Sequence, residues 1–327
     1  MKFRTTIRIP SPDIRLRYDS RLFLLGSCFS DNIGDKLSQH KFDSINNPFG
    51  VLYNPISVLN HSLKLAEENP DFRPDLQERS GLWFDYRFHS TFSHIRPEAA
   101  ERKMKSAFRL AERQFKKTDV LFLTWGTAFV YMLKENQQVV ANCHKQPGSL
   151  FDRKKLSTEE ICRSYTEFFQ LLESKYPDMS VVLTISPVRH LKDGFVENQR
   201  SKATLILAAE LLEMQFRQVS YFPAYEIMMD DLRDYRFYGQ DLCHPSVEAI
   251  EYLWECFSES YFTSDTRKLK HEIGEITAAA NHRLMFPESE EVQRFAQAQL
   301  KKIENIMPYL PPGKLDAERD YFKSLLK

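Results

Sequence analysis

Short apolar runs alternate with helical segments along most of this 327-residue chain, and this alternation constrains its fold more than any other feature. The clearest run is DVLFLTWG at 119–126, which is typical of a strand buried on both faces of a parallel sheet. Weaker strand-like runs occur at 22–26, 42–46, 180–187 and 219–228. The pattern predicts a three-layer, flavodoxin-like α/β fold, with a mostly parallel sheet of about five strands flanked by helices and right-handed crossovers.

The helical segments and two interruptions complete this expected layout. An aromatic segment at 80–95 is expected to be an insertion, and two alternating runs around a polar turn predict a hairpin at 129–144. One helix should begin at Ser157, which stands at capping-box spacing from Glu160. Helices are expected at about 30–40, 56–69, 98–117, 157–176 and 198–218, and from about 245 onwards.

The character of the chain changes beyond about Phe262. The remaining residues are mostly polar helix with periodic apolar positions such as Ile273, Ile276 and Ile303. We therefore expect residues 1–262 to form the α/β domain and residues 263–327 to form a helical C-terminal extension packed on it.

Charge and cysteine content narrow the possible partners and compartment. Lys plus Arg and Asp plus Glu number 45 each, so no overall field attracts nucleic acid or an anionic membrane. No apolar run reaches the roughly 18 residues of a membrane span, and the first residues do not read as a secretory signal. Five scattered cysteines without a CxxC pair favour reduced thiols. We expect a cytoplasmic protein without nucleic-acid or membrane partners, and its oligomeric state remains open.

Ser27 is the first candidate for chemistry. The sequence GSCFS at 26–30 follows the first expected strand, and ligands bind at the carboxyl ends of strands in open α/β sheets. A serine there could act as a nucleophile surrounded by backbone amides, or it could only cap the next helix. Cys28 is a rival nucleophile, although a neighbour of a cleft-facing residue normally points away from the cleft.

Asp241 and His244 are the second element. They lie in DLCHPS at 241–246, after the last expected strand and before a helix. In such a turn the carboxylate can hold the tautomer of the imidazole while the other ring nitrogen addresses a serine. A glycine-serine pair after the first strand combined with DxxH after the last strand is a much stronger signal than either motif alone.

Together these blocks resemble the GSCFA family, a branch of the SGNH (GDSL-like) hydrolases. The family's fifth letter, Ala, is replaced here by Ser30, a change between small residues. The resemblance spans about residues 20 to 260 and includes further blocks at 47–55, 124–128, 142–145, 186–190, 201–203 and 232–238.

The resemblance implies an SGNH fold with Ser27 as nucleophile, His244 as base and Asp241 as the residue that orients it. It also implies an oxyanion hole. The expected donors are the backbone amides of Ser27 or Cys28 and of Gly50. Ala128 stands where the superfamily has a third donor, asparagine, so Asn142 or an amide near Thr127 would have to replace it.

Other residues near the expected strand ends could bind substrate, or could instead be structural. Trp83 and His89 lie in the aromatic insertion, which could form a lid. Cys/His pairs at 143–144 and 243–244 lack zinc-site spacing, and neither a P-loop nor GxGxxG occurs, so we expect no metal and no cofactor. The other substrate-binding candidates are Gly126, Thr127, His144, Arg189 and His190.

These residues and the resemblance favour a serine esterase that works through an acyl-enzyme intermediate. The resemblance implies that it removes an acyl group from a carbohydrate or small ester. Transfer of the acyl group to a sugar hydroxyl is one alternative. A binding protein that retains the scaffold without turnover is the other.

Overall fold

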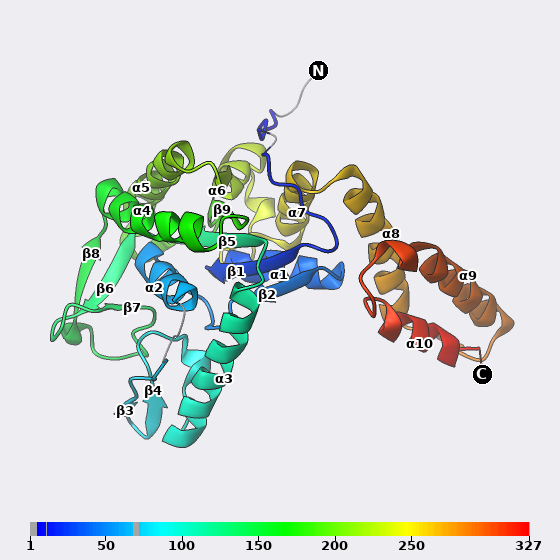
Figure 1. Ribbon diagram of the computed structural model, residues 1–327, viewed down its shortest axis with the longest axis horizontal. Helices are drawn as coiled ribbons and strands as arrows, with labels where there is room; N and C mark the ends of the chain where they lie inside the picture. The colour runs from blue at the N-terminus through cyan, green and yellow to red at the C-terminus, as the bar shows by residue number, and fades with distance from the viewer. Residues whose placement is uncertain (1–4, 11, 68–71, 327) are drawn as a thin grey trace.

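A computed structural model describes residues 5–10, 12–67 and 72–326, and its centre is a parallel five-stranded sheet (Figure 1). The strand order is β10-β9-β5-β1-β2. This is the flavodoxin-like order, and it confirms the predicted fold class. The order reverses between β1 and β5, so their carboxyl ends form the switch point where such folds bind ligands. The strands are β1 (Arg21–Gly26), β2 (Asp43–Asn46), β5 (Val120–Trp125), β9 (Ser180–Ile185) and β10 (Val219–Phe222).

Helices cover both faces of this sheet. Successive residues of β1 point to opposite sides, so Leu22 and Leu24 contact one core cluster while Phe23 and Leu25 contact the other. The first cluster includes side chains of α1 (Cys28–Gln39) and α7 (Val247–Tyr261). The second includes side chains of α2 (Pro55–Ala66), α3 (Pro97–Phe115), α4 (Thr158–Lys175) and α5 (Gly194–Gln215).

The expected hairpin is part of a larger antiparallel sheet. It forms from β6 (Phe129–Leu133) and β7 (Val139–Val140), and β8 (Phe151–Lys155) adds a strand that we did not predict. The β8 sequence FDRKK is mostly exposed and charged, so it lacks the apolar alternation that identifies a strand. Pairing with β6 stabilises this strand in place of burial.

Two other segments depart from the simple alternation. The insertion contains β4 (Leu82–Phe84), which pairs with the preceding β3 (Gln77–Arg79), and a short 3-10 helix at Ser90–Phe92. The run expected at 219–228 remains a strand only to Phe222. Pro223 cannot donate to a strand ladder, and the chain continues as α6 (Ala224–Glu226) and a π-helical turn.

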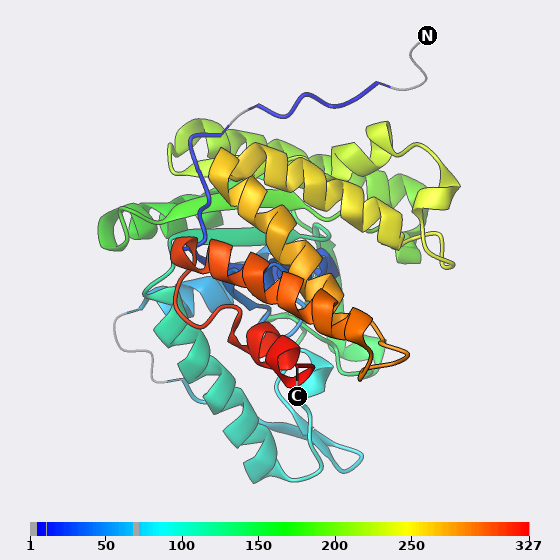
Figure 2. The same cartoon turned by 90° about the vertical axis from the view of Figure 1, so that its right-hand side faces the viewer.

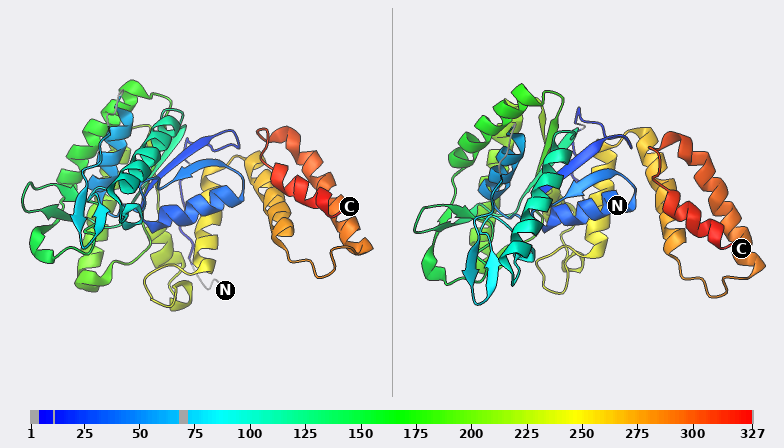
Figure 3. Two further views of the ribbon diagram at one scale, coloured as in Figure 1. Left: turned by 90° about the horizontal axis from the view of Figure 1, so that it is seen from below. Right: turned by 60° about the horizontal axis from the view of Figure 1, so that its bottom comes forward.

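The C-terminal segment forms α8 (Ser264–Asn281), α9 (Glu290–Ile306) and α10 (Asp316–Ser324), to one side of the α/β body (Figures 1 and 3). The three helices pack on one another (Figure 2). Near the end of α1, His40 Nδ1 lies 3.0 Å from Lys270 O, and Lys41 pairs with Glu318. Within the described ranges, no helix combines the length and apolar character needed to cross a bilayer.

Candidate active site

Ser27 lies where β1 passes into α1. Gly26 precedes it with φ +145°, and a Cβ at Gly26 would lie only 2.1 Å from the carbonyl oxygen of Thr124 in β5. Glycine is therefore required at this position by the close approach of the neighbouring strand. Ser27 is fully buried and caps α1, with Oγ accepting from the Phe29 amide at 3.3 Å.

The loop after β2 is fastened to the same strand end. Asn47 Oδ1 accepts from the Gly26 amide at 2.8 Å, and Asn47 Nδ2 donates to Asp31 Oδ1 at 2.8 Å. Burial raises the pKa of Asp31, and the hydrogen bonds from Asn47 and Asn46 oppose that rise. Sequence reasoning did not identify the role of Asn47, although it lies in the 47–55 block that supports the family resemblance.

Gly126 brings the end of β5 against Ser27. The amides of Gly126 and Thr127 both donate to Tyr53 O, at 2.8 and 3.0 Å. A Cβ built on Gly126 would lie 3.5 Å from Ser27 Cβ and 3.0 Å from His190 Nε2. Ser27 and His190 are therefore close to the same point, and a side chain at position 126 would crowd His190.

Lys202 is a buried lysine in the 201–203 block. We did not predict a chemical role for it from the sequence. Its Nζ donates to the carbonyl oxygens of Gly126 at 2.7 Å and Ser186 at 2.6 Å, which follow β5 and β9. The side chain is completely buried, and this burial lowers the pKa of Lys202 to about 7. The sequence held one clue to this role, because Lys202 occupies a position on the buried face of α5. A lysine is almost never fully buried without a partner.

The loop after β9 carries Arg189 and His190. The His190 amide donates to Asn198 Oδ1 at 2.9 Å, and the Arg189 amide donates to Cys243 O at 3.1 Å, which joins this loop to the Asp241–His244 turn. His190 Nε2 is buried without a hydrogen-bond partner in the described part of the chain. Burial, assisted by the charge of Lys202, lowers the pKa of His190 to about 3.

The turn after the last strand brings Asp241 and His244 into direct contact. Asp241 Oδ2 lies 2.6 Å from His244 Nδ1, and Asp241 Oδ1 accepts from the amides of Cys243 and His244, each at 3.0 Å. These hydrogen bonds hold the pKa of Asp241 well below its usual range. Leu242 between them has φ +56°, a left-handed conformation that is costly for leucine.

Ser27 belongs to the same edge but is not bonded to His244. Among residues 5–10, 12–67 and 72–326, no hydrogen bond joins Ser27 Oγ to the His244 ring. The loop after β9 connects the two, because His190 approaches Gly126 beside Ser27 while the adjacent Arg189 amide donates to Cys243 O in the Asp241–His244 turn. Catalytic hydrogen bonds in ligand-free enzymes often tighten only when substrate binds.

The expected oxyanion donors differ in availability. The Ser27 amide donates to Thr124 O at 3.1 Å, and the Gly50 amide donates to Asn47 O at 2.8 Å. Gly50 itself has φ +76°, and a Cβ there would lie 2.3 Å from His89 Cβ, so glycine is needed for the turn and for packing. The Cys28 amide has no acceptor within the described segments.

A cavity of about 270 Å³ opens beside this edge. Its lining includes the predicted site residues Thr127, Asn142 and His190. Tyr53, Phe129 and Tyr131 supply aromatic walls. Its charged residues are Lys192, which donates to the Tyr131 hydroxyl, and the ion pair Arg153–Asp193.

The remaining predicted binding residues serve the insertion. His144 stacks on Phe84 with ring centroids 4.4 Å apart, and its Nε2 lies 3.0 Å from Asp85 O, while its Nδ1 lies 3.3 Å from Ser93 Oγ. Trp83 exchanges backbone hydrogen bonds with His94. With His89 packed on Gly50, these three residues attach the insertion and do not line the 270 Å³ cavity. Arg189 instead extends over the Phe195 ring, 4.8 Å from its centroid.

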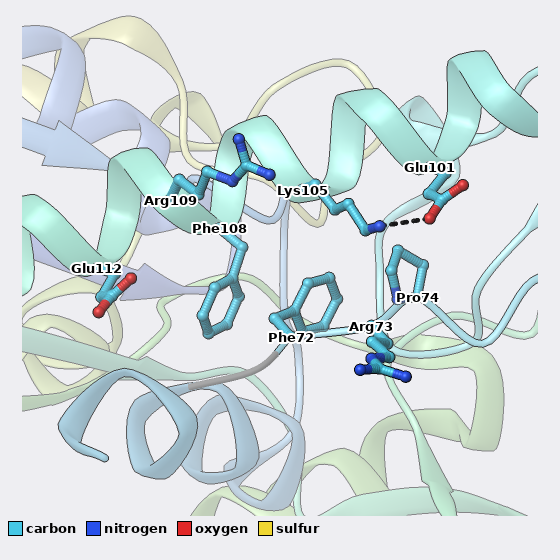
Figure 4. Close-up of a pocket in the computed structure, with 8 residues that line it drawn as sticks. All are labelled: Phe72, Arg73, Pro74, Glu101, Lys105, Phe108, Arg109 and Glu112. Carbon is cyan, nitrogen blue, oxygen red and sulfur yellow. Dashed lines mark ion pairs between the residues drawn. The ribbon is translucent and has the colours of Figure 1, made fainter. Parts of the chain in front are cut away.

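A larger groove lies away from the strand ends, between α3 and the segment at 72–74 (Figure 4). Phe72 and Phe108 stack in it with centroids 4.4 Å apart, and Glu101 pairs with Lys105 at its rim. It contains none of the predicted site residues. The described ranges also contain no group of three or more His, Cys, Asp or Glu side chains that could hold a metal ion.

The fold and this edge define a flavodoxin-like α/β protein with serine, histidine and aspartate side chains gathered near its switch point. The chain belongs to the GSCFA family, which matches residues 21–257. Residues 273–327 match the GSCFA domain protein, C-terminal domain. No curated protein matches the chain.

Solved structures with similar chains share little sequence with it. An acetyl xylan esterase (Est2A) from Butyrivibrio proteoclasticus is 10% identical, with a TM-score of 0.40 over 75% of this chain and 64% of that one. A carbohydrate esterase family 3 protein from Talaromyces cellulolyticus is 11% identical, with a TM-score of 0.32 over 78% and 99%. A Streptococcus pneumoniae protein, named provisionally as a platelet activating factor, is 12% identical, with a TM-score of 0.39 over 73% and 83%.

Proposed function

We propose that this protein is a serine hydrolase that cleaves an ester through Ser27, His244 and Asp241. The observation that supports this proposal most directly is the 2.6 Å contact between Asp241 Oδ2 and His244 Nδ1. This contact leaves His244 Nε2 as the ring nitrogen for proton transfer, which is the arrangement that a general base needs. His190 lies beside Gly126 and Ser27, and its loop is bonded to the turn of this pair through the Arg189 amide, which donates to Cys243 O.

The proposed reaction proceeds in two steps. Ser27 Oγ attacks the ester carbonyl carbon while its proton passes to His244 Nε2, and the carbonyl electrons move to the oxygen. Collapse of the tetrahedral intermediate breaks the bond to the leaving oxygen, which takes the proton from His244. Water then attacks the acyl-enzyme with His244 as base, which releases the carboxylic acid and restores Ser27.

We propose an acylated carbohydrate or another small ester as the substrate. The cavity of about 270 Å³ has aromatic walls at Tyr53, Phe129 and Tyr131, together with polar groups at Asn142 and Lys192. Pockets for small ligands combine apolar walls with a few oriented polar groups in this way. Acylated sugars present both an apolar ring face and hydroxyl groups.

Covalent labelling tests the nucleophile. The wild-type protein should react with a fluorophosphonate and hydrolyse short p-nitrophenyl esters or acetylated sugars, and Ser27→Ala should abolish both. Ser30→Ala is the matched control, because Ser30 is also buried in the first turn of α1 and bonds Thr124 Oγ1 at 2.7 Å. Labelling that persists in Ser27→Ala would exclude Ser27 as the nucleophile.

Acyl transfer, the alternative product of the same acyl-enzyme, is tested in the same assay. Adding a sugar acceptor should leave the yield of free acid unchanged if water is the natural acceptor. Diversion of the acyl group onto the sugar, at acceptor concentrations far below that of water, would support a transferase.

A non-catalytic binding protein is a second candidate, which the complete burial of Ser27 favours. In that case acetylated sugars should bind, as measured by calorimetry, without turnover or labelling. Binding of equal strength by Ser27→Ala and wild type, together with an unlabelled wild type, would support this function over the esterase.

A further inference from the structure

The backbone around Ser27 offers few free donors for an oxyanion. Four amides near Ser27 already have acceptors: those of Ser27, Gly50, Gly126 and Thr127 donate to Thr124 O, Asn47 O, Tyr53 O and Tyr53 O. The Cys28 amide remains available in the described chain. A tetrahedral oxyanion that accepted from one amide alone would be poorly stabilised, because each donor contributes substantially to the rate.

His190 places a side-chain nitrogen at this edge. Its Nε2 would lie 3.0 Å from a Cβ on Gly126, and Ser27 Cβ lies 3.5 Å from that same point. Nε2 is buried and has no hydrogen-bond partner among the described residues, which is costly for a polar atom unless a ligand satisfies it. The His190 backbone is fixed by the hydrogen bond from its amide to Asn198 Oδ1, and its ring packs nearly perpendicular to the Tyr53 ring, with centroids 5.7 Å apart.

Two histidines near one serine raise the question of which is the base. His244 has a carboxylate partner that stabilises an imidazolium, whereas His190 has no acidic partner and lies near the buried Lys202. Burial and that positive charge lower the pKa of His190 to about 3, so its imidazole is neutral at neutral pH. With its pKa lowered this far, the His190 imidazole is a weak base, but it can still donate a hydrogen bond.

We propose that His190 Nε2–H donates to the oxyanion formed on Ser27. The inference rests on the proposed esterase function. Lys202 acts as a positioning residue, because it holds the carbonyl oxygens of Gly126 and Ser186 on the two strand ends that place His190 beside Ser27.

Three variants test this assignment in the full-length protein, with p-nitrophenyl acetate as the probe. His190→Ala should lower kcat by about 10²–10³-fold with little change in KM, as expected for loss of one oxyanion donor. His190→Gln retains an N–H donor and should recover much of that loss, with an unchanged pH profile of kcat/KM. His271→Ala is the control, because it removes an exposed histidine on α8 outside this edge of the sheet, and it should leave kcat unchanged.

A second measurement separates catalysis from folding. Variants with thermal midpoints equal to wild type should bind a trifluoromethyl ketone, which forms a hemiketal oxyanion with the serine, and His190→Ala should bind it at least about tenfold more weakly. Ser27-dependent turnover with His190→Ala equal to wild type would overturn this inference alone. Loss in His190→Gln as complete as in His190→Ala would also overturn it, since that identifies a proton-transfer role.

The failure of the proposed function has a different signature. A folded wild-type protein that neither hydrolyses esters nor reacts with a fluorophosphonate overturns the esterase and the oxyanion role together.

Discussion

The two halves of the candidate site differ most in burial. The side chains of Asp241 and His244 are 53% and 54% exposed, whereas Ser27 and Lys202 are completely buried. The exposed half is a short turn held by its own local hydrogen bonds, and the buried half is held by contacts between β1, β5, β9 and α5. Changes in the exposed half should therefore alter chemistry alone, while changes in the buried half should alter stability as well.

His244→Ala should have the largest effect, and on activity alone. Loss of the base should lower ester hydrolysis by about 10⁴-fold or more, while urea unfolding should change by less than about 0.5 kcal/mol because the side chain is exposed. The control is His271→Ala, which removes an exposed histidine paired with Glu275 at 3.3 Å on α8. A large loss of stability in His244→Ala would contradict the contrast between the two halves.

Lys202→Met should affect stability most. The buried carbonyl oxygens of Gly126 and Ser186 lose their donor, so the free energy of unfolding should fall by about 2–4 kcal/mol in urea titrations. Lys268→Met provides the comparison, because Lys268 is 76% exposed on α8 and should tolerate the change. Equal stability of the two variants would show that the two hydrogen bonds from Lys202 are not needed for the stability of the fold.

The same lysine predicts a pH dependence. The pKa of Lys202 is lowered from 10.5 to about 7 in the folded protein. Between these values the unfolded chain holds a proton that the folded protein has released, so the stability contribution of Lys202 rises as pH increases. The difference in unfolding free energy between wild type and Lys202→Met should therefore grow from about pH 7 to about pH 10. A constant or shrinking difference would contradict the lowered pKa.

Leu242→Asn should have the smallest effect. Leu242 lies between Asp241 and His244 at φ +56°, a conformation that asparagine adopts more readily than leucine. The stability of the variant should therefore stay equal or rise by a few tenths of a kcal/mol. Leu207 is equally exposed, at 52%, but lies in α5, where Leu→Asn should cost about 0.5 kcal/mol. Activity loss in Leu242→Asn would show that the side chain, and not only the turn, serves the site.

Sequence reasoning was most effective where one periodic pattern determines one element. The central strand at 120–125 and its neighbours carry enough apolar character for their existence to be predicted. It failed for β8, whose charged residues reveal nothing without the partner strand β6. It also extended the last strand past Pro223, where tertiary packing forms a helical turn instead.

The periodic apolar runs of the sequence are enough to predict the α/β class, the positions that follow the strands, and the glycines that must stand beside Ser27. What those positions do depends on contacts between distant segments of the fold. In the fold, the amides of Ser27 and Gly50 donate to backbone oxygens, and Lys202 donates to two carbonyl oxygens. His190 Nε2 is left without a hydrogen-bond partner in the described chain. The reason is that a hydrogen bond depends on which distant segment supplies the other atom, and parallel strands that lie side by side are far apart in sequence.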